Sequence, residues 1–278
     1  MKRLSLIAIL ILLCSCSKLV LHPKSELDFT PADFGYKYQN VFIDTDSGKL
    51  HAWFIASSKK SKGTVLFLHS NAGNISSHFV TASWLANQGY NLLLPDYSGY
   101  GRSEGRTSLN SIHRDLEPVL AYLSKQESLK PIAIWGQDLG ANLGMYLAAN
   151  SFYRSNLCLL IAEGTVPSYQ DVFKKRLEKY WLLKPISRPL SKLMDDSLSA
   201  RKYISKISPL PLLMVHGTHD NITPLDRAQA LFKLAIAPKE FWKIDGAQHI
   251  NSFYRNQKRQ AALSGYLDNF CAELPAPN

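Results

Sequence analysis

The chain has 278 residues, of which 46% are hydrophobic and 19% are charged, a balance typical of a globular protein and unlike that of a disordered one. About 260 residues remain after an N-terminal leader is set aside, which is enough for one large α/β domain. The formal net charge is +10, but residues 171–206 hold ten Lys or Arg against four Asp or Glu and supply +6 of it. The rest of the chain is close to balanced and shows no basic motif interleaved with aromatic residues, so no nucleic-acid partner is expected.

The N-terminus has the pattern of a leader for export. A basic start at residues 1–3 is followed by residues 4–13, which are apolar except for Ser5. About ten apolar residues cannot span a bilayer, which needs roughly 20, so residues 1–15 are predicted to be a signal peptide. The segment Leu13-Cys14-Ser15-Cys16 resembles a bacterial lipobox, which implies lipidation of Cys16, and the Ser17 after it favours the outer membrane. The resemblance implies a lipid-anchored protein of the bacterial cell envelope that faces the periplasm; an ordinary secretory signal is the alternative.

The region after the leader changes from polar to strand-like. Residues 16–36 contain prolines and show little periodicity, and we expect them to form a lipidated tether that holds a domain away from the membrane. Residues 38–44 and 50–56 are separated by Asp46-Ser47-Gly48 and predict an antiparallel hairpin.

Beyond the hairpin, apolar strand-like segments alternate with helical segments, a pattern that predicts parallel βαβ units. The expected strands are residues 64–69, 90–95, 132–135, 157–162, 210–216 and 241–244, and the expected helices are residues 76–87, 109–126, 139–150, 224–237 and 251–271. Pro118 predicts a kink in the second helix. The predicted fold class is therefore α/β, with a mostly parallel central sheet, an antiparallel N-terminal edge and helices on both faces, over residues 37–274. Residues 164–209 interrupt the alternation and are expected to form a short lid.

Two cysteines lie inside this domain. Cys158 falls in an apolar, strand-like run, and we expect it to be a buried free thiol. A disulfide between Cys158 and Cys271 is the alternative. The sequence predicts no cofactor and no metal site, and it leaves the oligomeric state open.

The segment Gly136-Gln137-Asp138-Leu139-Gly140 lies between an expected strand and an expected helix. It resembles the nucleophile elbow of the α/β-hydrolases, in which the central residue is usually serine. The sharp turn forces that residue into a positive-φ conformation, which aspartate tolerates better than most other residues. The N-terminus of the following helix favours an ionised carboxylate. The resemblance therefore implies that Asp138 occupies the nucleophile position.

Two later loops supply the other positions of a catalytic triad. Residues 216–224 read His-Gly-Thr-His-Asp-Asn-Ile-Thr-Pro after an apolar strand, and this resembles the H-G-x-x-D-x-x-x-P pattern that carries the acid in α/β-hydrolases. His249 follows the last expected strand, so the order nucleophile, acid, histidine is that of the family. The resemblance implies that Asp220 is the acid and His249 the base. Glu163, at the end of an earlier strand, is a second possible acid.

The oxyanion hole of such a site needs two backbone N–H groups. The N–H of Leu139, directly after the nucleophile, is one candidate. The loop at residues 69–74 reads His-Ser-Asn-Ala-Gly-Asn and resembles the H-G-N-A-G-N of small lysophospholipase-like and palmitoyl-thioesterase-like hydrolases, which places Asn71 at the second position. Residues 96–105 resemble the D-Y-R-G-Y-G-x-S-x-G stretch of the same branch. The chain departs from this branch at Asp138, where serine is expected, and at Ser70, where glycine is expected.

These residues allow three functions. The first is a hydrolase acting on a small ester-like or lipid-derived substrate. The second is a catalytically degenerate protein that keeps the pocket for binding. The third is an epoxide hydrolase or dehalogenase type of enzyme, because those families resemble this chain in having G-x-D-x-G at the elbow and form an alkyl ester on the aspartate.

The expected lid carries a helical segment with apolar and basic side chains. Four aromatic or aliphatic residues fall at helical spacing among four basic ones; the apolar set is Phe173, Leu177, Tyr180 and Trp181, and the basic set is Lys174, Lys175, Arg176 and Lys179. The segment either packs as a lid with a solvated basic face or forms a membrane-facing amphipathic surface.

Overall fold

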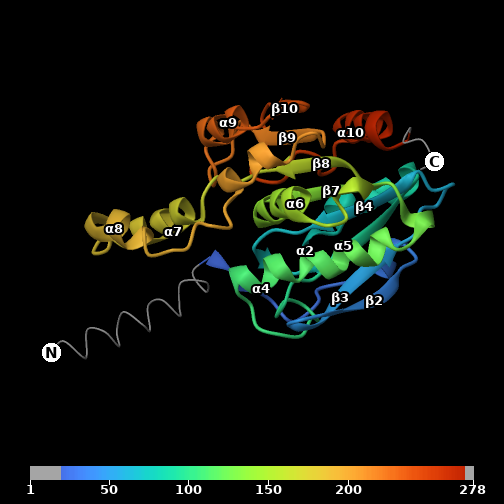
Figure 1. Ribbon diagram of the computed structural model, residues 1–278, viewed down its shortest axis with the longest axis horizontal. Coiled ribbons are helices and arrows are strands. Elements are labelled where there is room, and N and C mark those ends of the chain that lie inside the picture. Colours follow the sequence, from blue (N-terminus) through green and yellow to red (C-terminus); the bar gives the residue numbers. More distant parts are fainter. Residues whose placement is uncertain (1–19, 273–278) are drawn as a thin grey trace.

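A computed structural model describes residues 20–272 of the protein (Figure 1). The predicted signal peptide and Cys16 lie outside the described residues. Within the described range, the structure contains no helix with the length and apolar character needed to cross a membrane.

The core of the molecule is an eight-stranded sheet with the strand order β10-β9-β8-β7-β4-β6-β3-β2. The six strands from β10 to β6 run parallel, and β3 is antiparallel to both of its neighbours. This arrangement confirms the predicted fold class and its antiparallel N-terminal edge. The strands are β2 (Gln39–Thr45), β3 (Gly48–Ile55), β4 (Gly63–Leu68), β6 (Tyr90–Pro95), β7 (Ile132–Gln137), β8 (Leu157–Glu163), β9 (Leu212–Gly217) and β10 (Lys239–Ile244).

Both faces of the parallel strands are apolar because helices cover both faces (Figure 1). Along β4, Leu66 and Leu68 belong to the buried cluster on one face, while Val65 and Phe67 belong to the cluster on the other. The chain runs outward from β4 to β6 and later crosses to β7 on the other side of β4. Such a reversal of strand order leaves a crevice at the carboxyl ends of the strands, where ligands bind in open α/β sheets.

Several helices differ from their expected bounds for local reasons. Residues 75–88 form three short pieces, α2 (Ile75–His78), α3 (Val80–Ser83) and the 3-10 helix η2 (Trp84–Gln88). The predicted kink near Pro118 is a break between α4 (Leu109–Arg114) and α5 (Leu116–Ser124), consistent with a proline that cannot donate a hydrogen bond to the carbonyl of Arg114. The remaining helices of the domain are α6 (Leu139–Asn150), α9 (Leu225–Lys233), α10 (Gln257–Cys271), η3 (Glu127–Leu129) and η4 (Arg154–Asn156).

The two cysteines of the domain form a disulfide, so the prediction of a buried free thiol at Cys158 is wrong. Helix α10 lies over β8, and this packing places the Cα atoms of Cys158 and Cys271 5.3 Å apart, although 113 residues separate them in the sequence. Both cysteines are buried. The error arose because an apolar strand shows that Cys158 is buried but does not show which helix covers it.

The described part of the expected tether lies against the domain. Strand β1 (His22–Pro23) pairs in parallel with the short strand β5 (Ala72–Gly73), and the 3-10 helix η1 (Pro31–Phe34) follows. The ring of Phe34 packs edge-on against Phe79, with the ring centroids 5.1 Å apart. From residue 20 onward, this segment is therefore part of the packed structure rather than a spacer. We refer to residues 20–24 as the N-terminal strap.

The lid forms an arm that projects from the body of the molecule (Figure 1). Its elements are α7 (Tyr169–Glu178), η5 (Lys184–Ile186), α8 (Ser187–Ser191), η6 (Ala200–Lys202) and η7 (Ile204–Lys206). Phe173 and Leu177 of α7 are buried and join the core cluster that covers one face of the sheet.

Candidate active site

Asp138 lies at the turn between β7 and α6, with φ of 52° and ψ of −108°. A Cβ atom on Gly136 would lie 2.1 Å from the carbonyl oxygen of Gly140, and one on Gly140 would lie 2.0 Å from the carbonyl oxygen of Leu68. Neither glycine can therefore carry a side chain. An aspartate before a helix often caps its first turn, but the Asp138 carboxylate makes no capping bond to α6. The carboxylate lines the cavity instead.

The loops after β9 and β10 bring Asp220 and His249 together. A Cβ atom on Gly217 would lie 2.2 Å from the carbonyl oxygen of Ala247, so the absence of a side chain at Gly217 allows the two loops to touch. Asp220 Oδ2 lies 2.7 Å from His249 Nδ1. Asp220 Oδ1 accepts hydrogen bonds from the backbone N–H groups of Ile222 and Thr223, each at 2.8 Å. These bonds fix the carboxylate against the imidazole.

His249 also reaches the elbow, because its Nε2 lies 3.6 Å from Asp138 Oδ1. The structure thus brings together all three residues that were predicted for the triad. Glu163, the second possible acid, accepts hydrogen bonds from Gln137 Nε2 at 2.8 Å and from the backbone of Ser252 at 2.9 Å. Glu163 therefore holds Gln137, the residue next to Asp138, and makes no hydrogen bond to His249.

The histidine between two carboxylates is a cation at neutral pH. Burial alone lowers the pKa of His249, but the nearby carboxylates of Asp138 and Asp220 outweigh burial and raise the pKa to about 10. Burial raises the pKa of Asp220, but the hydrogen bond and charge of His249 outweigh it and hold that pKa below its usual value. Both ring nitrogens of His249 therefore carry protons.

The loop predicted to carry the oxyanion donors lines the same cavity as Asp138. The side-chain amide of Asn71 donates to the carbonyl of Val20 at 2.6 Å, and the Asn71 carbonyl accepts from the backbone N–H of His22 at 2.9 Å and from the Tyr100 hydroxyl at 2.8 Å. The strap and one tyrosine thus fix Asn71. Leu139 begins α6, so its N–H belongs to the first turn, whose donors have no partner within the helix.

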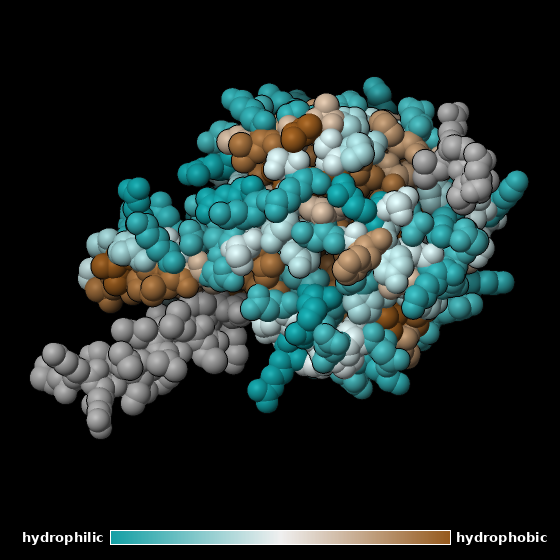
Figure 2. All heavy atoms as spheres, viewed as in Figure 1, coloured by the Kyte–Doolittle hydropathy of each residue, from teal (hydrophilic) through white to brown (hydrophobic). Residues whose placement is uncertain are grey.

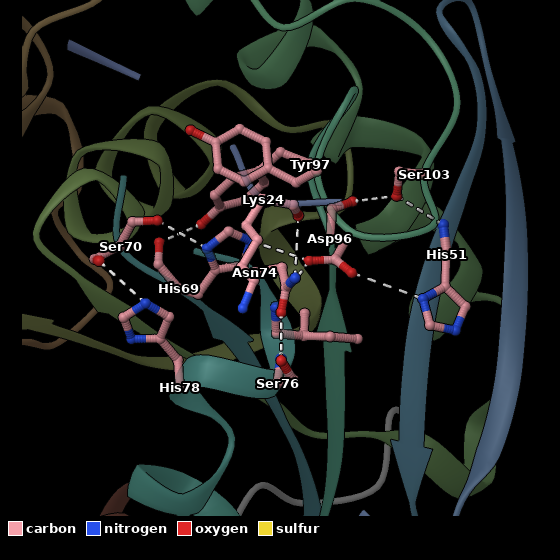
Figure 3. Close-up of polar contacts among 12 residues, drawn as sticks. Lys24, His51, His69, Ser70, Asn74, Ser76, His78, Asp96, Tyr97 and Ser103 are labelled. Carbon is pink, nitrogen blue, oxygen red and sulfur yellow. Dashed lines mark hydrogen bonds and ion pairs between the residues drawn. The ribbon is translucent and has the colours of Figure 1, made fainter. Parts of the chain in front are cut away.

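Ser70, the second departure from the family pattern, is held by a neighbouring histidine (Figure 3). His78 Nε2 lies 2.9 Å from the carbonyl oxygen of Ala72 and 3.2 Å from Ser70 Oγ. A carbonyl only accepts, so this nitrogen carries the proton and cannot remove one from Ser70. Ser70 is therefore not activated as a nucleophile in place of the serine that is missing at the elbow.

A buried polar network lies beneath this loop (Figure 3). Burial and the nearby His78 lower the pKa of His69 to about 3, so its neutral ring donates from Nδ1 to the Ser70 carbonyl at 2.7 Å. Asp96 Oδ1 accepts from the backbone of Ile75 at 2.8 Å and lies 3.6 Å from His69 Nε2. A Cβ atom on Gly101 would lie 1.9 Å from Asp96 Oδ2. The motif at residues 96–105 therefore acts by supporting the oxyanion loop.

Asp138 and His249 line a cavity of about 520 Å³, a volume suited to a small molecule. One wall comes from the elbow and the oxyanion loop, and the other comes from the lid and from residues 221–224. Five basic side chains line it against two acidic ones outside the triad; the set is Lys174, Lys175, Arg176, Lys179, Arg227, Asp171 and Glu178. A positively charged wall favours a ligand with an anionic group.

Sequence reasoning did not predict the contribution of the strap or of residues 221–224. Arg176 of α7 donates to the ring of His22 at 2.6 Å, so the lid is tied to the strap beside the oxyanion loop. A two-residue strand that contains proline has no periodicity to reveal it. The H-G-x-x-D-x-x-x-P pattern did contain a signal for the second segment, because its spacing places residues 221–224 next to the acid.

Known proteins resemble this chain in sequence. A profile of the family described as serine aminopeptidase, S33, matches residues 59–196. The uncharacterized protein YfhR of Salmonella typhi is 31% identical over 241 residues, which cover 81% of this chain and 79% of that protein. The α/β hydrolase domain-containing protein WAV2 of Arabidopsis thaliana is 29% identical over 217 residues, which cover 75% of this chain and 70% of that protein.

Solved structures agree on the fold. The Pyrococcus furiosus esterase Pf2001 superposes with a TM-score of 0.73 at 22% identity, over 90% of this chain and 100% of that chain. An esterase from Exiguobacterium antarcticum superposes with a TM-score of 0.62 at 19% identity, over 83% of this chain and 100% of that chain. The sequence relatives, the strand order and the elbow together show that this chain belongs to the α/β-hydrolase superfamily.

Proposed function

We propose that the protein is a membrane-anchored hydrolase that acts on a small, lipid-derived substrate through a covalent ester on Asp138. The observation that carries this proposal is the position of His249, whose Nε2 lies 3.6 Å from Asp138 and whose Nδ1 lies 2.7 Å from Asp220. Both carboxylates favour the protonated, cationic ring. A cationic imidazole cannot remove a proton from a nucleophile or from water. A carboxylate needs no such help, because the reference pKa of an aspartate side chain is about 3.9.

A carboxylate nucleophile favours attack on a saturated carbon. Attack on an ester carbonyl would produce a mixed anhydride, whereas attack on an epoxide or an alkyl halide produces an ordinary alkyl ester. For an epoxide, an Asp138 oxygen bonds to one ring carbon while the bond between that carbon and the ring oxygen breaks. The released oxygen takes the proton from Nε2 of His249. Substrate and enzyme are then joined through an ester, and no proton has been lost.

Formation of the ester changes the role of His249. Asp138 no longer carries a negative charge, so the pKa of His249 falls and the neutral ring becomes a base. It accepts a proton from a water molecule that attacks the Asp138 carbonyl carbon. The backbone N–H groups of Leu139 and Asn71 stabilise the oxyanion, and its collapse breaks the ester bond and releases the alcohol, which takes that proton from His249. The Asp138 carboxyl left behind keeps the second proton of the water and passes it to His249, which restores the starting carboxylate and imidazolium.

A second candidate function is ligand binding with little turnover. The same ion pair between His249 and Asp138 that prepares the acid also reduces the negative charge available for attack. The departures at Asp138 and Ser70 would then mark a site that keeps its pocket after losing the family's serine chemistry. Turnover in ¹⁸O-labelled water distinguishes ligand binding from the covalent route.

Lipidation of Cys16 would provide the membrane anchor. The disulfide supports export, because disulfides persist in oxidising compartments such as the bacterial periplasm. One acyl chain gives only marginal membrane binding, but two or more hold a protein firmly. We therefore propose a lipid-anchored envelope protein on the outer membrane.

The covalent route is tested by turnover in ¹⁸O-labelled water. The protein is incubated with epoxide, haloalkane and short-chain ester substrates, and the Asp138 peptide is analysed by mass spectrometry. Label in the Asp138 carboxylate after turnover establishes the ester intermediate, and Asp138→Asn is the matched control. Turnover of a substrate with no label at Asp138 contradicts the covalent route, and the absence of turnover with every substrate favours the binding function.

A further inference from the structure

The end of the lid arm carries a group of exposed apolar side chains (Figure 2). We call residues 179–193 the lid tip. The exposed fractions of its apolar side chains are 61% for Tyr180, 80% for Trp181, 67% for Leu182, 47% for Ile186 and 53% for Leu193. The expected amphipathic face at Phe173, Leu177, Tyr180 and Trp181 is therefore divided, because its first two residues are buried in the core and its last two lie on the tip.

The charges of the lid tip are all positive. Lys179, Lys184, Arg188 and Lys192 are exposed, and no Asp or Glu occurs from residue 179 to residue 194. Among residues 20–272, none of these four side chains has a carboxylate within ion-pair distance. Aromatic and aliphatic side chains surrounded by Lys and Arg are typical of surfaces that enter the headgroup region of an anionic bilayer.

We infer that the lid tip inserts into the surface of an anionic membrane and that the active-site cavity receives its substrate from there. We call Lys179, Lys184, Arg188 and Lys192 the basic rim of the tip. The basic rim favours an anionic lipid surface as the partner over a second copy of the chain, because two such rims would repel each other. Long Lys and Arg side chains can place their charges at the headgroups while their stems lie along apolar groups. The apolar tip and the basic rim are thus complementary to the same partner.

The position of the tip relative to the cavity gives the insertion a functional meaning. Lys179, the first residue of the tip, lines the cavity together with Lys175 of α7. At the base of the arm, Arg176 is bonded to His22 of the strap. Val20 is four residues after Cys16, and four extended residues span at most about 14 Å. An anchor on Cys16 would therefore hold the cavity mouth and the tip against the same membrane. This last step rests on the proposed lipidation, but insertion of the tip does not.

The test uses the emission of Trp181 in the full-length protein reconstituted into vesicles of phosphatidylglycerol with brominated acyl chains. Bromine quenches tryptophan only within the bilayer. Trp53 and Trp135 are fully buried and serve as internal unquenched emitters. We expect bromolipid to quench a component of the emission that is missing in Trp181→Phe. We also expect Lys184→Gln, Arg188→Gln and Lys192→Gln together to reduce that component at least about twofold in anionic vesicles, because each cation near the surface contributes attraction.

A matched control places a tryptophan on another exposed site. Phe152 is 92% exposed and follows α6, whose 12 residues extend about 18 Å away from Asp138. Phe152→Trp in the Trp181→Phe background should show no quenching. The inference is overturned if Trp181 escapes quenching, if residue 152 is quenched equally, or if Trp181 is instead shielded by a second copy in a crosslinked dimer. None of these readouts depends on hydrolysis, so failure of the proposed function would be seen separately.

Discussion

At the residue scale, the charge of His249 is a consequence of the carboxylate at the elbow. With serine at that position, one of the two groups that raise the pKa of His249 would be missing. Replacement of Asp138 by Asn should therefore lower the pKa of His249 from about 10 toward its ordinary value of 6.5. NMR titration of the His249 ring measures this change directly. An unchanged pKa would show that Asp220 alone holds the proton and would remove the basis for the proposed acid role.

The same pKa predicts how stability depends on pH. The folded protein binds the His249 proton more tightly than the unfolded chain, because the pKa is about 10 against an ordinary 6.5. The stabilisation is fully present below pH 6.5 and is lost as the pH rises through about 10. We expect the difference in free energy of unfolding between the wild type and His249→Gln to shrink by about 1 to 4 kcal/mol over this window. Urea titrations at a series of pH values measure it, and a constant difference would contradict the prediction.

The family resemblance also predicts a gain of function. Asp138→Ser restores a hydroxyl nucleophile and removes one charge beside His249, so the histidine can act as its base. We expect activity on p-nitrophenyl acetate or butyrate to rise at least about tenfold above the parent. The double variant Asp138→Ser with His249→Gln is the control and should show no gain. If the folded Asp138→Ser variant also shows no gain in activity, the prediction is wrong, and the side chain of Ser70 is the first residue to examine.

At the element scale, the sequence predicted those features that depend only on residues close to one another in the chain. Helix α6 has the predicted bounds, Leu139–Asn150. The turn at Asp138 fixes where the helix begins, and the segment after it contains no proline to interrupt it. The positions of Asp138 and Asp220 were also predictable, since the elbow pattern and the H-G-x-x-D-x-x-x-P pattern each place one residue at one turn. The disulfide and the strap were not predictable, because each depends on which distant segments touch. The helical pattern of the lid also did not show where α7 ends. Phe173 and Leu177 are therefore buried, whereas Tyr180 and Trp181, which follow the helix, are exposed.

The disulfide between β8 and α10 should contribute to stability. It closes a loop of 113 residues and so restricts the unfolded chain. We expect Cys158→Ala with Cys271→Ala to lower the free energy of unfolding by about 2 to 4 kcal/mol. Urea unfolding followed by circular dichroism measures the loss. Treatment of the wild type with a reductant should give a loss of similar size, and a variant as stable as the wild type would contradict the expectation.

At the scale of the whole molecule, the leader predicts where the protein resides. We expect the wild type to fractionate with membranes and Cys16→Ala to be released or to remain unprocessed, because it lacks the acyl chains that give firm binding. Fractionation followed by mass spectrometry of the N-terminal peptide measures both outcomes. Ser15→Ala is a suitable control, since it keeps a small residue before the cysteine. Equal membrane binding of Cys16→Ala without a lipid would show that another part of the chain holds the protein there.

The pairing of β1 with β5 has a practical consequence for expression and assay. A shortened chain that begins at residue 37 would retain all eight strands of the main sheet and the entire triad. It would lack the Val20 carbonyl and the His22 N–H that hold Asn71. The oxyanion loop of such a truncated protein would lose these supports, and its activity would fall for that reason alone. The loss of activity could then be attributed to Asp138 in error, so recombinant versions should retain every residue from 20 onward.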